Sequence, residues 1–125
     1  MTIVHGNALQ DIETPGGNFG SGVATPSHGA VEVSVIRQRQ RPSGANLDHT
    51  HDREEVMILL AGVVIVTLEE ESLTLRPGDA LIVPAKTTHR IENHGAELAE
   101  WLLVAPAGVR FFHANGEEGT PPWSL

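Results

Sequence analysis

Residues that could bind a metal ion gather in the short stretch Asp48–Glu55, which reads DHTHDREE. His49 and His51 stand at positions i and i+2, so on an extended strand both side chains leave the same face and can converge on one ion. Imidazole is the commonest neutral metal ligand, and a nearby carboxylate suits a first-row divalent transition metal. The alternative is a polar loop whose histidines only titrate at about pH 6.5. The two histidines by themselves leave both interpretations open.

The spacing of the surrounding residues favours the metal site. Gly44 precedes His49 with four residues between them, and after His51 come three residues, Glu55, six residues and Gly62. A second block follows downstream at regular intervals, with Gly78, Pro84, His89 and Asn93. The two blocks closely resemble the paired motifs of the cupin superfamily, G-x5-H-x-H-x(3,4)-E-x6-G and G-x5-P-x-G-x2-H-x3-N. The resemblance covers residues 31–105, most of the chain.

This resemblance implies an all-β fold, a small antiparallel β-barrel of the jelly-roll type (a double-stranded β-helix) with a metal inside. It also implies four ligands for one divalent transition metal, His49, His51, Glu55 and His89. Three imidazoles and one carboxylate leave about two positions on a six-coordinate ion for water, substrate or dioxygen. Iron, manganese, nickel, zinc and copper all fit this ligand set, and the sequence does not select among them.

The choice of carboxylate rests on the same spacing. Glu54 would leave two residues after His51, whereas the family's motif has three or four, the interval that Glu55 fits. Glu55 also begins an apolar run, EVMILLAG, that is typical of a buried strand. The other acids of the stretch are expected to be solvated or to lie behind the ligands, namely Asp48, Asp52 and Glu54.

The chain departs from the family's motifs in two places. One residue is missing between Gly44 and His49, which leaves the ligand spacing intact. Lys86 stands where the second motif has a glycine. A glycine there usually supplies a positive φ, which lysine adopts only at a cost. Either the turn is of another type or Lys86 tolerates it, and a solvated side chain is favoured over one that attracts an anionic ligand.

Other residues could line a pocket inside such a barrel. Arg37 and Arg39 share a face with Val33 and Val35 and could bind a carboxylate if that face lines the barrel, but exposure to solvent is favoured. Trp101 is expected in the core, with a place in a pocket wall as the alternative. Four apolar residues are further candidates that need no functional explanation, Met57, Leu59, Ile91 and Leu103.

The remaining polar residues are expected to have structural roles or to lie at the surface. Asn93 is expected to fix the backbone or a ligand histidine. His94 has the opposite parity to His89 and should face away from the ion. The histidines outside the motifs are expected at the surface, namely His5, His28 and His113.

The elements that must position these residues are short strands. Runs such as VEVSVIRQRQ, VVIVTLEE and LAEWLLVAP recur at intervals of roughly 8–12 residues and are bounded by glycine, proline or acidic turns, which predicts a sandwich or barrel. No long window has an apolar stripe of helical period. We expect a single domain over 1–125: an irregular N-terminal arm (1–28) with at most one short strand, a barrel core (31–105) and a polar tail (106–125). Phe111, Phe112 and Trp123 are expected to anchor the tail.

Composition limits the classes of partner. A chain of 125 residues with a net charge of −8 is an unsuitable partner for nucleic acid or an anionic membrane. It has no cysteine, so any metal must be held by nitrogen and oxygen atoms. The first residues lack a basic segment followed by an apolar one, and no stretch approaches 18 apolar residues, so a soluble cytoplasmic protein is expected.

The functional expectation follows from the resemblance. The leading hypothesis is a metal-dependent enzyme that acts on a small organic molecule inside the barrel, of dioxygenase, isomerase, decarboxylase or cyclase type. No catalytic residue beyond the ligands can be assigned. The alternative is a non-enzymatic cupin that binds or senses a small molecule. A homodimer is also expected, because cupins commonly pair and pairing covers exposed strand edges.

Overall fold

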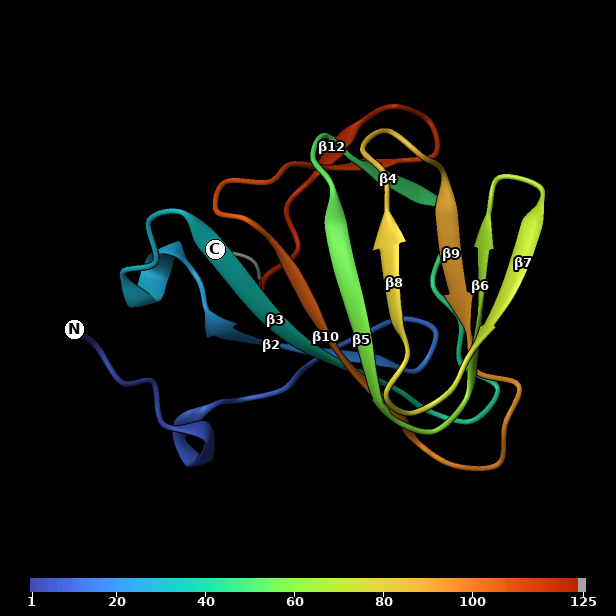
Figure 1. Ribbon diagram of the computed structural model, residues 1–125, viewed down its shortest axis with the longest axis horizontal. Coiled ribbons are helices and arrows are strands. Elements are labelled where there is room, and N and C mark those ends of the chain that lie inside the picture. The colour runs from blue at the N-terminus through green and yellow to red at the C-terminus, as the bar shows by residue number, and fades with distance from the viewer. Residues whose placement is uncertain (124–125) are drawn as a thin grey trace.

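The structure is a computed structural model that describes residues 1–123, and it is built almost wholly from antiparallel strands (Figure 1). Within these residues the strands form two six-stranded sheets. In spatial order the first sheet contains β1 (Ile12–Thr14), β2 (Asn18–Ala24), β3 (Val33–Gln40), β10 (Ala99–Pro106), β5 (Glu55–Ala61) and β8 (Ala80–Val83). The second contains β12 (Glu118–Gly119), β11 (Phe111–His113), β4 (His49–His51), β9 (His89–Glu92), β6 (Val64–Leu68) and β7 (Glu71–Leu75). Two single turns of 3-10 helix, η1 (Gly6–Ala8) and η2 (Pro26–His28), complete the elements.

The order of the strands confirms the predicted all-β jelly-roll barrel. Strands far apart in sequence are neighbours, as β3 and β10 are in one sheet and β4 and β9 in the other. The inward faces of the two sheets meet in one apolar core. Its buried members are Met57, Leu59, Val64, Val66, Leu75, Ile91, Ala99 and Trp101. No helix within residues 1–123 is long and apolar enough to cross a membrane.

Gly62 of the first motif shapes the turn between β5 and β6. Its φ is +79°, a left-handed conformation that residues with a Cβ rarely adopt. A Cβ at this position would also lie 2.8 Å from the Cα of Ala99. The turn therefore needs glycine for both its backbone conformation and its close packing against β10.

The prediction for the N-terminal arm is wrong in one respect, since residues 1–28 contribute two strands to the first sheet. β1 pairs with β2, and β2 pairs along most of its length with β3. The sequence NFGSGVA of β2 does not indicate a strand, because glycine is depleted in strands. The reason for the glycines is packing at long range. A Cβ on Gly20 would lie 2.3 Å from the indole of Trp123, so the bare backbone makes room for the C-terminal segment.

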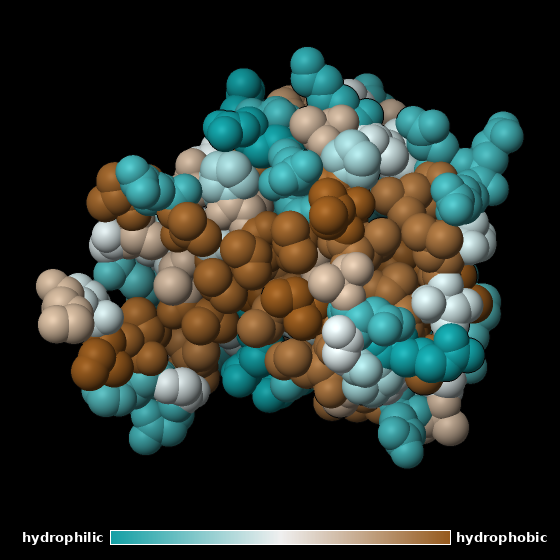
Figure 2. Space-filling view, viewed as in Figure 1, coloured by the Kyte–Doolittle hydropathy of each residue, from teal (hydrophilic) through white to brown (hydrophobic). Residues whose placement is uncertain are grey.

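The inward face of β3 is not the one with the valines. Ser34, Ile36 and Gln40 are buried, whereas Val33 is 53% exposed. Because side chains alternate along a strand, Val33 and Val35 lie on the outside of the first sheet. The outward positions of its other strands are apolar too, including Ile58 on β5 and Ile82 on β8, which is 62% exposed. Figure 2 shows the result, a broad hydrophobic area across the middle of this face.

Candidate metal centre

The fold brings three of the predicted ligands together. His49 and His51 lie on β4 with one residue between them, and His49 pairs directly with His89 of the neighbouring strand β9. One ring nitrogen from each of the three imidazoles can be chosen so that all lie within 4.8 Å of one another. The two motifs therefore meet because β4 and β9 are adjacent, although 40 positions of sequence separate His49 from His89.

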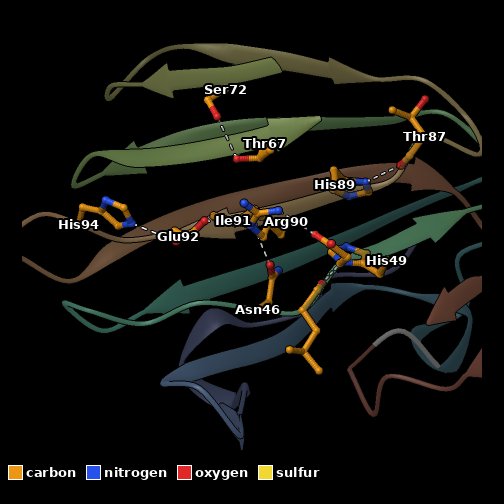
Figure 3. Close-up of polar contacts among 12 residues, drawn as sticks. Asn46, His49, Thr67, Ser72, Thr87, His89, Arg90, Ile91, Glu92 and His94 are labelled. Atoms are coloured by element: carbon orange, nitrogen blue, oxygen red, sulfur yellow. Dashed lines mark hydrogen bonds and ion pairs between the residues drawn. The ribbon is translucent and has the colours of Figure 1, made fainter. Parts of the chain in front are cut away.

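Backbone carbonyls orient two of these rings. His49 Nδ1 lies 2.8 Å from the carbonyl oxygen of Leu47, and His89 Nδ1 lies 2.9 Å from that of Thr87 (Figure 3). A carbonyl oxygen can only accept, so each Nδ1 carries the proton and donates. Each Nε2 is then unprotonated in the neutral ring and has a lone pair available for a metal. A hydrogen bond of this kind fixes both the tautomer and the ring orientation of a ligating histidine.

The surroundings of His49 and His89 favour the neutral form of these two imidazoles. Burial, reinforced by the neighbouring His89, lowers the pKa of His49 to about 3. Burial is also the largest cause of a lowered pKa at His89. A metal ligand must be unprotonated, so these shifts remove the competition of protons for the site at neutral pH.

Glu55 borders this group of histidines. It begins β5, its side chain is 3% exposed, and its Oε1 lies 2.7 Å from Nδ1 of His51. Despite this distance the two atoms do not have hydrogen-bond geometry, and neither has another partner in the described part of the chain. Two buried polar atoms so placed are costly unless a shared partner satisfies both. Glu54, by contrast, is exposed, as predicted.

The histidines open into a cavity of about 490 Å³ between the two sheets. The size lies within the range of small-molecule sites. The walls are mostly apolar and include Ile36, Met57, Val66, Trp101 and Phe111. Of the four apolar residues predicted for the pocket, Met57, Ile91 and Leu103 line it, whereas Leu59 is buried in the core. Trp101 belongs both to the cavity wall and to the core, and 1% of its surface is exposed.

The two arginines of β3 have other partners. Arg39 donates to Asp11 and to Glu100 over 2.6 Å each, and Arg37 pairs with the same Asp11 at 3.7 Å. Arg39 borders the rim of the cavity, but its charge is used in these ion pairs. Lys86 is exposed and adopts a φ of +62°, so it tolerates the conformation that the motif gives to glycine. Its backbone N–H donates to the carbonyl oxygen of His51 over 2.7 Å.

Asn93 has the first of its two expected roles, since it fixes the backbone. It is completely buried, and its Nδ2 donates to the carbonyl oxygens of Gln40 and Glu97. Its Oδ1 accepts from the N–H of Gly95. His94 is exposed and bonds Glu92 over 3.0 Å, as expected for a residue that faces away from the site (Figure 3).

Sequence reasoning missed three residues of this region. Phe111 stacks on His49 with ring centroids 5.1 Å apart, and the exposed His113 borders the cavity rim. Both lie on β11, which pairs with β4. Gln38 lines the cavity from β3. No local pattern could have placed them there, because the pairing of β11 with β4 joins segments about 60 residues apart and the inward face of β3 is the less apolar one.

Comparisons with known proteins agree with the fold. Residues 36–105 match the cupin domain family, so this chain belongs to the cupins. A curated relative, the uncharacterized protein MJ1618 of Methanocaldococcus jannaschii, is 40% identical over 48 residues, which are 38% of this chain and 38% of that protein. The match thus spans well under half of the relative's length.

Solved structures share the architecture. The polyketide cyclase RemF from Streptomyces resistomycificus superposes with a TM-score of 0.77 at 21% identity, over 87% of this chain and 81% of that one. An oxalate decarboxylase from Lactobacillus farciminis, in complex with formate, superposes with a TM-score of 0.78 at 21% identity, over 89% of this chain and 35% of that one. At these identities the likeness shows the fold, and the neighbours show that enzymes are built on it.

Proposed function

We propose that this cupin holds one divalent transition metal through His49, His51, His89 and Glu55, and that it is a metal-dependent enzyme acting on a small organic molecule inside the barrel. The observation that carries the proposal is the convergence of three imidazoles, two of them buried, at the wall of a cavity of about 490 Å³. A cluster of buried histidines without a ligand would cost stability with nothing to offset it.

The donor set fits such an ion. Two rings have Nδ1 bonded to a backbone carbonyl, which leaves Nε2 for the metal, and the carboxylate of Glu55 supplies a negative charge and the unsatisfied atom Oε1. Three nitrogens and one oxygen suit iron, manganese, nickel, zinc or copper. When bound, the metal would supply Lewis acidity toward an oxygen atom of the substrate or a site for dioxygen.

The protein's own residues support this role in two ways. The walls are mostly apolar, so a ligand that fills the cavity would displace water, and a drier site strengthens electrostatic interactions with that ligand. Phe111 packs on His49 and shields the ring from solvent on that side. These features position a substrate and dry its surroundings, and they are compatible with a dioxygenase, isomerase, decarboxylase or cyclase.

One observation favours a second candidate, a cupin that binds or senses a small molecule without turnover. Apart from the metal-site residues, the titratable side chains that border the cavity are Arg39, Asp48 and His113 among those described. Arg39 and Asp48 are engaged in ion pairs, and His113 is exposed at the rim. No described acid or base is therefore free and buried beside the metal site for proton transfer.

Elemental analysis and turnover together test the proposal. Protein purified without chelator or nickel resin should contain about one transition metal per chain, and His89→Ala should lose it, whereas His94→Ala at the surface should retain it. Absence of metal even after reconstitution would refute the metal centre. Metal-loaded protein is then incubated with metabolite extracts, with and without oxygen. Products formed by the wild type and not by His89→Ala support an enzyme, while a ligand retained unchanged supports the binding alternative.

We also propose that the chain forms a homodimer, through the outer face of the first sheet rather than through strand edges. We call this surface the outer face and define it by the outward residues Val33, Val35, Val56, Ile58, Ile82, Leu102 and Val104. Four strands of this length span on the order of 400 Å² in projection. A standard interface buries roughly 800 Å² per partner, so the contact would extend beyond these seven residues.

Charge complementarity agrees with a second copy as the partner. The charged residues that share this side of the sheet are internally neutralised, because Arg37 and Arg39 pair with Asp11 and Glu100. In a two-fold dimer the same patch of each copy faces its counterpart, so a patch without net charge can pair without repulsion. The largest apolar patch on a protein surface is often an interaction site.

A further inference from the structure

Gln38 occupies a distinctive position in the cavity wall. It lies on the inward face of β3, opposite Trp101 on β10 and opposite Gly20 on β2. Because Gly20 has no side chain, nothing from that neighbour covers Gln38 within the sheet. The indole of Trp123 lies over Gly20 instead, and both Gln38 and Trp123 border the cavity.

Trp101 fixes which way the amide of Gln38 points. The indole Nε1 of Trp101 lies 2.8 Å from Oε1 of Gln38. An indole N–H can only donate, so the amide oxygen must face it. Trp101 is 1% exposed and has no freedom to move away. The amide nitrogen of Gln38 is therefore held on the other side, and its Nε2 has no hydrogen-bond partner among the described residues.

The charges around the cavity disfavour anionic ligands. The guanidinium of Arg39 is bonded to both Asp11 and Glu100 at the rim, and Asp48 is paired with Arg90 at 3.2 Å. Lys86, the one lysine of the sequence, does not line the cavity. The wall thus offers no free cation among the described side chains. An anionic group away from the metal would lose its hydration without an opposite charge to replace it.

From these observations we infer that the cavity binds a largely apolar ring compound, uncharged away from the metal, with a carbonyl or ether oxygen that accepts a hydrogen bond from Nε2 of Gln38. Trp101 acts as the positioning residue for that donor. Aromatic surfaces from Phe111 and Trp123 border the same space and suit a flat ligand. The inference names the substrate class of the proposed metal site and rests on that proposed function for its biological meaning.

A pair of matched probes tests the donor. 2-Acetylnaphthalene carries a carbonyl oxygen, and 2-isopropylnaphthalene has nearly the same shape without it. Dissociation constants are measured by titration calorimetry with the protein as purified and after removal of metal. The wild type should prefer the ketone by about tenfold in both forms, the size expected for one hydrogen bond that satisfies a desolvated donor. Equal binding of the two probes to the metal-free wild type would overturn the inference.

The variant Gln38→Glu separates ligand binding from structural support. A glutamate oxygen still accepts from the indole N–H of Trp101, so the fold keeps that hydrogen bond, but the side chain no longer presents an N–H to the ligand. The preference for the ketone should disappear in this variant, while 2-isopropylnaphthalene binds within about twofold of the wild type. A preference that persists in Gln38→Glu would show that Gln38 only supports Trp101, and would overturn the inference.

A charged probe tests the claim of an uncharged ligand. In the metal-free protein 2-naphthoate should bind at least about tenfold more weakly than 2-acetylnaphthalene. Equal or tighter binding of the naphthoate would refute this part. The metal content of Gln38→Glu, measured by elemental analysis, should equal that of the wild type. Elemental analysis therefore tests the metal centre, and the probe titrations on metal-free protein test the Gln38 donor, so failure of one proposal can be told from failure of the other.

Discussion

Oε1 of Glu55 and Nδ1 of His51 lie 2.7 Å apart without a hydrogen bond between them, and both are buried with no other partner in residues 1–123. Two atoms with lone pairs this close repel each other unless a third atom, a proton or a metal ion, lies between them. A metal ion is such an atom, since two adjacent ligands of one ion are held close together by bonds of about 2.1 Å. The relationship supports Glu55 as a fourth ligand, which the distances among the three histidines alone do not decide.

Replacing Glu55 by Gln should weaken metal binding by more than about 100-fold, because the loss of a charged ligand should exceed the 10- to 100-fold cost of losing a residue that only orients one. Glu54→Gln is the matched control and should leave the affinity unchanged, since Glu54 is exposed. Competition titrations with a chromogenic chelator measure both. Equal effects of the two substitutions would overturn the assignment, and a loss of only 10- to 100-fold would reassign Glu55 to orienting His51.

The metal-free protein should lose stability as the pH is lowered from about 6.5 toward 3. The folded state lowers the pKa of His49 from 6.5 to about 3, mainly through burial. Between these values the unfolded chain binds the proton and the folded chain does not. Acid therefore favours the unfolded state, with a slope of up to about 1.4 kcal/mol per pH unit for this one group.

Urea unfolding at a series of pH values measures this slope. His94→Asn, at the surface, should follow the wild type. His49→Gln, which cannot titrate, should have a shallower dependence over the same window. A free energy of unfolding that is independent of pH between about 6.5 and 4 would contradict the buried, neutral state of His49.

The histidine site could be predicted from sequence because its information is local. His49, His51 and Glu55 lie within seven positions, and the interval to His89 is fixed by the strands and turns that the motifs encode. The alternation of apolar residues in β5 likewise reports a face that is buried against the core, with Met57 and Leu59 inward.

The errors of prediction arise where distant packing decides. The glycines of β2 look unfit for a strand until Trp123, some hundred positions later, is seen to lie against Gly20. In β3 the alternation alone does not say which face is inward; the valines lie on the outer face, and Gln38 faces the cavity. An apolar face of a strand is buried either in the core or against another chain, and the pattern does not say which. A functional cavity also contains polar residues that a closed apolar core would exclude.

Asn93→Asp should destabilise the protein by about 2 to 4 kcal/mol. The substitution keeps the shape but replaces a buried donor by a carboxylate oxygen that faces the carbonyls of Gln40 and Glu97. Asn115→Asp is the control, because Asn115 is exposed and uses only its oxygen, which accepts from the N–H of Glu117. Urea unfolding measures both variants, and similar small effects would show that Asn93 is dispensable.

Lys86→Gly should stabilise the protein by about 0.5 to 1 kcal/mol. Relief of a left-handed conformation is worth about 1 to 2 kcal/mol, and the entropy of the unfolded glycine offsets part of the gain. Lys86→Ala keeps the Cβ at a φ of +62° and should change the unfolding free energy less. The same urea experiment compares the two. A glycine variant less stable than the alanine variant would mean that the turn does not strain Lys86.

Ile82→Lys should convert the proposed homodimer to a monomer. Ile82 is 62% exposed at the outer face, and a charge there would be buried without a partner if two copies packed on each other. Ile3→Lys is the matched control, because Ile3 is 75% exposed but lies in the N-terminal segment outside the outer face. Sedimentation equilibrium should give twice the chain mass of 13.4 kDa for the wild type and for Ile3→Lys, and the single mass for Ile82→Lys with an unchanged circular dichroism spectrum. A wild type that is monomeric at high micromolar concentration would refute the dimer, and a dimer that survives Ile82→Lys would place its interface elsewhere, at the strand edges that the outer face leaves free.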